Sequence, residues 1–201
     1  WLGSGLAGQV AIVAAVAVVL GAADIPFDWY RQFRVEEKFG FNRMTPRLFI
    51  ADLLKSVLVA AALGLPLVAL VLWLMGAAGP WWWLYAWIVW VGFNAMVLVL
   101  YPTVIAPLFN KFEPLADGDL AARIGALLAR TGFSSRGVFV MDGSRRSAHG
   151  NAYFTGLGRS KRIVFFDTLL QRLQPSEIEA VLAHELGHFK RRHIAKRLAF
   201  S

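Results

Sequence analysis

The sequence predicts a mainly α-helical membrane protein. At least three transmembrane helices are followed by an α+β region with a small β-sheet and a helix that carries a His-Glu-x-x-His motif. Of the 201 residues, 57% are hydrophobic and 17% are charged, which is unusual for a soluble domain of this length. No residue between Lys55 and Lys111 carries a charge, whereas the segment after Asn110 holds fifteen Lys or Arg and eight Asp or Glu. We therefore predict a membrane region followed by a polar region.

Three apolar segments are long enough to cross a bilayer, whose hydrocarbon core is about 30 Å thick and needs about 20 helical residues. They are residues 6–23, 57–75 and 82–105. A short turn with two glycines and a proline separates the second segment from the third. Three tryptophans at residues 81–83 follow this turn, which is typical of the aromatic belt at a membrane surface.

The domain boundary is expected between residues 110 and 111. Residues 1–110 form the transmembrane region, with a basic loop at residues 28–48, and residues 111–201 form the polar region. The loop holds Lys and Arg residues and the turn before the tryptophans holds none, so the positive-inside rule places the loop and the polar region in the cytoplasm.

The net charge of +8 lies mainly in these cytoplasmic parts. No nucleic-acid partner is expected, because no recognition motif accompanies the basic residues. The expected partner of the three spans is the lipid bilayer. Spans that are low in charge and rich in Ala, Leu and Trp favour the inner membrane of a bacterium.

The polar region alternates between helical and β-strand patterns. Apolar residues at helical spacing follow Asp119 and end before Gly132, which predicts an amphipathic helix with a start and a stop signal. Short β-branched or aromatic runs at residues 137–141, 151–156 and 162–167 predict three strands. Helical spacing then resumes at Pro175, a residue suited to the first turn of a helix.

The second helix of this region carries the His-Glu-x-x-His motif. His184 and His188 are about 40° apart around the helix axis and about 6 Å apart along it, so both imidazoles can reach one metal ion. Glu185 lies about 60° from His188, which places its carboxylate beside the ion rather than on it. The motif therefore predicts one Zn²⁺ held by His184 and His188, which lowers the pKa of a bound water. Glu185 would act as the general base for that water.

A third protein ligand is still required. The chain contains no cysteine, so it must come from a His or a carboxylate. His193 lies about 140° from His188 and about 180° from His184 on a continuous helix, so we interpret it as a basic residue at the helix end. His149 in the loop before the second strand is an alternative ligand, although a lone loop histidine is more often solvated.

Four stretches together resemble the type I CAAX prenyl protease family, which are membrane zinc endopeptidases. The resemblance covers most of the chain from about Tyr30 onward and implies a zincin-like catalytic region. The stretches, in chain order, are EEKFGFNRMTPRLFIADLLK, YPTVIAPLFNKFEPL, NAYFTGLGRSKRIVFFDTLL and EAVLAHELGHFKRRH.

The resemblance implies a role for each site residue. It makes His184 and His188 the zinc ligands and Glu185 the general base. It also implies that Asn151 and Ala152, on a strand edge beside the zinc, hydrogen-bond a peptide or protein substrate bound as an extended strand. The family's third ligand is a Glu on a later helix. We therefore expect the chain to be an inactive fragment of a larger multi-span enzyme, truncated at both ends.

The function expected for the complete enzyme is that of a membrane-integral zinc metalloendopeptidase. One alternative is an HtpX-like membrane quality-control protease, although the stretch YPTVIAPLFNKFEPL and the Tyr of NAYF favour the CAAX-type family. A second alternative is a non-catalytic membrane scaffold in which the motif helix serves packing alone.

Overall fold

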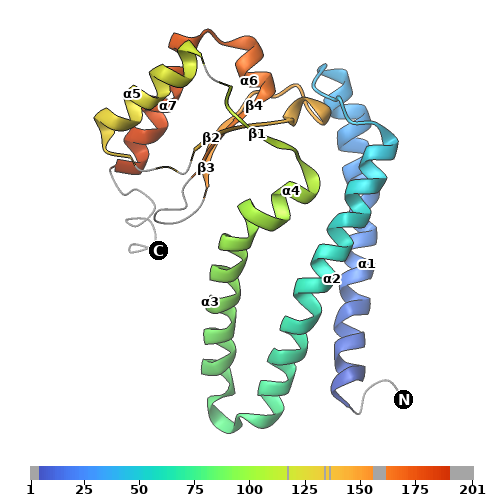
Figure 1. Ribbon diagram of the computed structural model, residues 1–201. Helices are drawn as coiled ribbons and strands as arrows, with labels where there is room; N and C mark the ends of the chain where they lie inside the picture. Colours follow the sequence, from blue (N-terminus) through green and yellow to red (C-terminus); the bar gives the residue numbers. More distant parts are fainter. Residues whose placement is uncertain (1–4, 117, 134, 136, 156–161, 191–201) are drawn as a thin grey trace. The chain divides into compact units, whose positions relative to one another are not determined.

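The computed structural model describes residues 5–116, 118–133, 135, 137–155 and 162–190, with the backbone alone at Glu185 and at residues 188–190 (Figure 1). Backbone contacts divide the chain into two compact units that meet between Phe109 and Asn110. The first unit is helical, and the second holds the sheet and the motif helix.

Three helices in the first unit are long and apolar enough to cross a membrane: Leu6–Glu36, Pro46–Ala77 and Gly79–Phe109. The first consists of α1 (Leu6–Tyr30) and the π-helical turn η1 (Arg31–Glu36), and the second is α2 (Pro46–Ala77). The third begins with the 3-10 turn η2 (Gly79–Trp81) and continues through α3 (Trp82–Leu100), η3 (Tyr101–Ile105) and α4 (Ala106–Phe109). All three contain the predicted spans and extend beyond them. Many of their large apolar side chains are exposed, as suits contact with lipid or with other membrane helices.

The connection between α1 and α2 is held by the side chain of Asn42. Its oxygen accepts hydrogen bonds from Gln32 Nε2 at 2.6 Å and from the Met44 N–H at 2.9 Å, and its amide donates to Glu37 at 2.8 Å.

The α2 helix then begins at a Thr45 cap, whose hydroxyl accepts the Leu48 N–H, with Pro46 in the first turn.

Lys55 joins α2 to the end of the third helix. Its Nζ donates a 2.8 Å hydrogen bond to the carbonyl of Leu108 and lies 5.9 Å from the centroid of the Phe109 ring. A cation is favourable there, because the last carbonyls of a helix carry partial negative charge and have no partner within the helix.

The second unit is built on a mixed four-stranded sheet of order β1-β2-β4-β3. The strands are β1 (Phe112–Pro114), β2 (Val138–Met141), β3 (Ala152–Thr155) and β4 (Arg162–Phe166). The β2 and β4 strands are parallel, whereas β1 and β3 run antiparallel to their neighbours. Helices α5 (Asp119–Thr131), α6 (Asp167–Arg172) and α7 (Pro175–Lys190) accompany the sheet, with a 3-10 turn, η4, at Gly143–Arg145.

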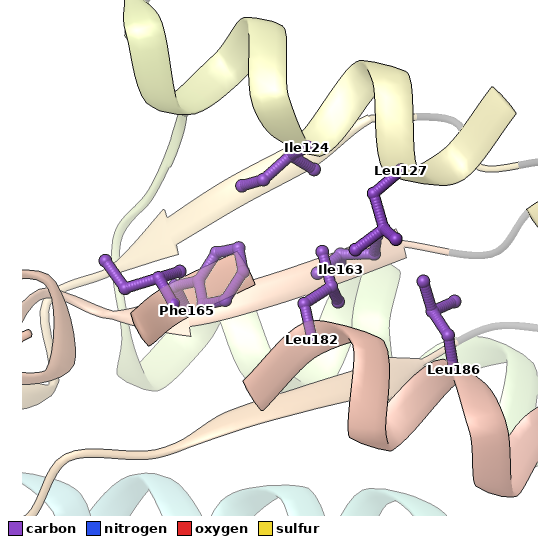
Figure 2. Packing of buried hydrophobic residues seen from close by; sticks show 7 residues of the cluster. Ile124, Leu127, Ile163, Phe165, Leu182 and Leu186 are labelled. Carbon is purple, nitrogen blue, oxygen red and sulfur yellow. The ribbon is translucent and has the colours of Figure 1, made fainter. Parts of the chain in front are cut away.

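One hydrophobic core joins α5, α7 and β4 (Figure 2). Side chains from α5 and α7 converge on those of β4, and all of them are at most 6% exposed. The core residues are Ile124, Leu127, Ile163, Phe165, Ile178, Leu182 and Leu186. Burial of one such side chain contributes about 1.5–3 kcal/mol. The apolar face of α7 therefore packs into this core, which holds the helix against the sheet.

The predicted fold class is confirmed: the helices come first, and the small sheet and the motif helix follow. Strands β2, β3 and β4 lie within one residue of the predicted ranges, and α5 ends at Gly132, which adopts φ +65° as a C-cap. The structure also contains β1 and α6, three and six residues long, which the sequence patterns do not predict.

Candidate functional site

The α7 helix places its core residues and the first histidine of the motif on different faces. Ile178 and Leu182 are each 1% exposed and Leu186 is 3% exposed, so every fourth residue faces the core. His184 lies about 200° around the helix axis from Leu182, and its side chain is exposed. The first motif histidine is therefore on the face of α7 opposite the core.

Glu185 and His188 also lie on α7, which is continuous from Pro175 to Lys190. By position on the helix, residue 188 follows residue 184 by about one turn, on the same side of the axis. The side chains of Glu185 and His188, and the whole of His193, lie outside the part of the chain that the structure describes. The distances between the three motif side chains are thus predictions from ideal helix geometry.

Within the described side chains, no group of three or more His, Cys, Asp or Glu is arranged to hold a metal ion. The alternative ligand His149 is exposed and sits in the loop before β3, where its N–H is bonded to the hydroxyl of Ser147 at 3.2 Å. The structure therefore does not bring His149 into a ligand cluster with other described residues.

The β3 strand is an edge strand, as the substrate-binding hypothesis requires. It pairs with β4 on one side, and no described strand pairs with its other side. The N–H of Phe166 donates to the carbonyl of Asn151 at 2.9 Å. Because backbone groups alternate along a strand, those of Tyr153 also point to β4, while those of Ala152 and Phe154 point to the open edge.

Asn151 and Ala152 interact directly with each other. The side-chain oxygen of Asn151 accepts a 2.8 Å hydrogen bond from the N–H of Ala152. Of the two backbone groups that Ala152 turns to the open edge, the N–H is thus bonded to Asn151. An incoming strand would have to displace this bond or accept a hydrogen bond from the Asn151 amide nitrogen instead.

The two aromatic residues of β3 lie on opposite faces of the sheet. The Phe154 ring contacts Phe133 edge-on with centroids 5.4 Å apart, and it packs against the hydrophobic core. The Tyr153 ring contacts Phe166 at 6.2 Å, and its hydroxyl donates to the sulfur of Met141. These contacts fix β3 on both faces and leave its edge to offer backbone groups.

Phe154 was missed as a candidate binding residue. Its backbone N–H and carbonyl face the same open edge as those of Ala152, two residues earlier. The two-residue period of a strand could have revealed this once Ala152 was placed at an edge.

Comparison with known proteins gives consistent matches to both units. The family model described as "CAAX prenyl protease N-terminal, five membrane helices" matches residues 1–111, and that of peptidase family M48 matches residues 114–201. The CAAX prenyl protease 1 homolog of Dictyostelium discoideum is 45% identical over 190 residues, which cover 94% of this chain and 44% of that protein. CAAX prenyl protease 1 of Saccharomyces cerevisiae is 45% identical over 181 residues, covering 89% and 40%.

A solved structure is also similar. The crystal structure of Ste24p from S. mikatae matches with a TM-score of 0.91 and 41% identity, over 98% of this chain and 46% of that one. The chain spans less than half the length of the relatives it matches. On the evidence of both regions, the chain belongs to peptidase family M48, with the N-terminal membrane domain of the CAAX prenyl proteases.

Proposed function

We propose that the complete protein is a membrane-integral zinc metalloendopeptidase that cleaves peptide bonds at the surface of α7. The observation that carries this proposal is the division of α7, whose core residues hold one face while the first histidine of the motif is exposed on the other. A helix held in this way can present His184, and His188 one turn later, to a substrate without losing its packing.

The donor set fits zinc. His184 is exposed on α7, His188 follows one turn later along the same continuous helix, and imidazole nitrogen is a common zinc ligand. These two residues would hold the ion, together with a third ligand from elsewhere in the complete protein. When bound, zinc makes a water molecule acidic enough to ionise near neutral pH and polarises the carbonyl of the peptide bond.

The proton transfers are assigned to Glu185. Its carboxylate accepts the proton of the attacking water and returns it to the nitrogen of the leaving amine as the C–N bond breaks. As a non-ligand, Glu185 is needed for turnover and not for metal binding. This separates its role from that of the two histidines.

The substrate is proposed to add to β3 as an extended strand. The backbone of Ala152 and Phe154 and the side chain of Asn151 would hydrogen-bond the peptide, which aligns its scissile bond with the zinc site. The relatives named above are CAAX prenyl proteases, so the proposed substrate class is a prenylated protein C-terminus.

The domain limits and the location are proposed along with this function. Residues 1–110 would form the transmembrane region and residues 111–201 the catalytic region, on the cytoplasmic side, as basic residues in the first loop indicate. The relatives named above are eukaryotic, so the inner membrane of a bacterium rests on the composition of the spans alone.

The decisive experiment compares wild-type protein and Glu185→Gln, each complete and purified with zinc. A farnesylated CAAX peptide and an unfolded membrane protein serve as substrates. We expect wild type to cleave the peptide efficiently, and Glu185→Gln to lose about 10³-fold or more in kcat with its zinc content unchanged.

Three other outcomes lead to different conclusions. Preferential cleavage of the unfolded membrane protein would indicate the quality-control alternative. Absence of both zinc and cleavage in wild type would indicate a scaffold. Unchanged cleavage by Glu185→Gln would refute the proposed mechanism.

A further inference from the structure

We propose that Asp167 and Thr168 are positioning residues that set where β3 begins, and thereby place Asn151 and Ala152 against the substrate. This inference rests on the proposed function, because it concerns how the same binding strand is held. Its structural basis is the loop at residues 143–150, which leads directly into Asn151 and is attached to the junction of β4 and α6.

Asp167 attaches the first part of the loop. Its Oδ1 accepts hydrogen bonds from the N–H of Ser144 at 2.8 Å and from the N–H of Thr168 at 2.8 Å. Its Oδ2 accepts a hydrogen bond from the Ser144 hydroxyl. Hydrogen bonds to an ionised acceptor are stronger than neutral ones, so this carboxylate joins the loop firmly to the start of α6.

Thr168 attaches the last part of the loop. Its hydroxyl donates a 2.7 Å hydrogen bond to the carbonyl of His149. Thr168 is 2% exposed, and it is the one polar residue among the described residues that are buried. A buried hydroxyl without a partner is strongly unfavourable, so this bond resists displacement.

Two glycines show how closely the loop lies on this junction. A Cβ atom at Gly143 would lie 2.6 Å from Cδ2 of Phe166, which is closer than the van der Waals contact distance of two carbon atoms. A Cβ atom at Gly150 would lie 3.1 Å from Cδ1 and 3.3 Å from Cα of Leu169. The loop backbone therefore contacts β4 and α6 at both of its ends.

The attachments follow one another in order along both segments. Residues 143, 144, 149 and 150 meet residues 166, 167, 168 and 169 in turn, and the Asn151 carbonyl then accepts the Phe166 N–H at 2.9 Å. A shift of the loop would break several of these contacts together. The hydroxyl of Thr168 and the carboxylate of Asp167 thus determine the position at which β3 starts.

Positioning of this kind affects an extended ligand and a small ligand differently. A displacement of about 1 Å at the binding strand can cost about 10²-fold in rate for a peptide that must align with the reacting groups. A small chelator that contacts only the zinc makes no use of β3. The two ligands therefore distinguish misplacement of the strand from general damage to the site.

The experiment uses the complete, zinc-loaded protein with Thr168→Val, which keeps the shape and removes the hydroxyl, and Thr168→Ser, which restores it. The readouts are KM and kcat per bound zinc for a farnesylated CAAX peptide, and the inhibition constant of acetohydroxamate. We expect Thr168→Val to raise KM about tenfold or more and Thr168→Ser to stay within about twofold of wild type. The acetohydroxamate constant should be unchanged in both.

Thr131→Val is the matched control. The hydroxyl of Thr131 donates to the carbonyls of Leu127 and Leu128 within α5, so its loss removes a hydrogen bond of the same kind without touching the loop. Its KM should equal that of wild type. Ser144→Ala, which removes only the hydroxyl bond to Asp167, provides a milder second variant if Thr168→Val fails to fold, and its KM should rise about threefold.

The positioning proposal is wrong if KM is unchanged in Thr168→Val, or, should that variant not fold, in Ser144→Ala. It is also wrong if Thr168→Ser or Thr131→Val raises KM as much as Thr168→Val does. Failure of the proposed function gives another result, because Glu185→Gln would then cleave the peptide as wild type does. If Glu185→Gln loses activity and Thr168→Val keeps the KM of wild type, the positioning role is wrong and the proposed function still stands.

Discussion

Leu182 and His184 are two residues apart on α7 and face in opposite directions. Leu182 is 1% exposed and packs in the core against α5 and β4, whereas the side chain of His184 is exposed. The core residues and the exposed motif histidine thus lie on different faces of one helix. Substitutions on the two faces should therefore have separable effects on stability and on activity.

On the exposed face, His184→Ala should remove zinc and activity while the protein stays folded. One imidazole of the proposed ligand set is lost, and no core contact is lost with it. Zinc content by elemental analysis should fall to background and the circular dichroism spectrum should match wild type. Treatment of wild type with a chelator should reproduce the same state, and activity should return when zinc is restored. Retention of zinc by the variant would exclude His184 as a ligand.

On the buried face, Leu182→Ala should lower the free energy of unfolding by about 2–5 kcal/mol, because it removes buried methyl groups and leaves a cavity between α7 and β4. Val181→Ala is the control, since Val181 is 36% exposed and adjacent in sequence. It should change stability by about 0.5 kcal/mol or less. Denaturant unfolding monitored by fluorescence or circular dichroism measures both. Equal losses in the two variants would contradict the assigned orientation of α7.

At the strand edge, Asn151→Ala should weaken peptide binding. It removes the amide that is bonded to the Ala152 N–H and that is proposed to contact the substrate. One net hydrogen bond corresponds to about a threefold to tenfold rise in KM. Stability should change little, because the Asn151 side chain is exposed. A KM equal to wild type would remove Asn151 from the binding site, although Ala152 and Phe154 could still bind through their backbones.

In α5, two glycine-to-alanine substitutions should act in opposite directions. Gly125 lies inside the helix, and no atom outside its own turn lies within 4 Å of the position that an alanine methyl group would take, so alanine should stabilise the protein by about 0.5–1 kcal/mol. Gly132 ends the helix at φ +65°, where alanine should cost about 1–2 kcal/mol. Thermal unfolding of both variants tests the sign. Stabilisation by Gly132→Ala would contradict the left-handed C-cap.

The sequence predicted the longer elements of the fold because their patterns repeat over several turns or alternate between turn residues. The β1 strand escaped because it has three residues and includes Pro114, a residue type that is confined to edge strands and strand ends. The α6 helix escaped because the six residues DTLLQR are too short to show a helical period. In both segments, tertiary contacts rather than local pattern decide the conformation.

The candidate site was predictable only in part, for a similar reason. Four-residue spacing predicts that His184 and His188 share one side of a helix, and the structure confirms the continuous helix that this needs. The edge position of β3 was also expected. The bond between the Asn151 side chain and the Ala152 N–H, and the attachment of the preceding loop through Asp167 and Thr168, depend on how distant segments meet. Nothing in the local sequence specifies such contacts.

The edge of β3 that no described strand covers has a further consequence for handling the protein. Unpaired backbone groups on an edge strand are a template for any extended chain, including the same strand of another molecule. Concentrated protein without substrate should therefore self-associate through β3, and a strand-mimicking peptide inhibitor should keep it monodisperse. The backbone groups that would let the complete protein bind peptides of varied sequence should thus also promote its self-association.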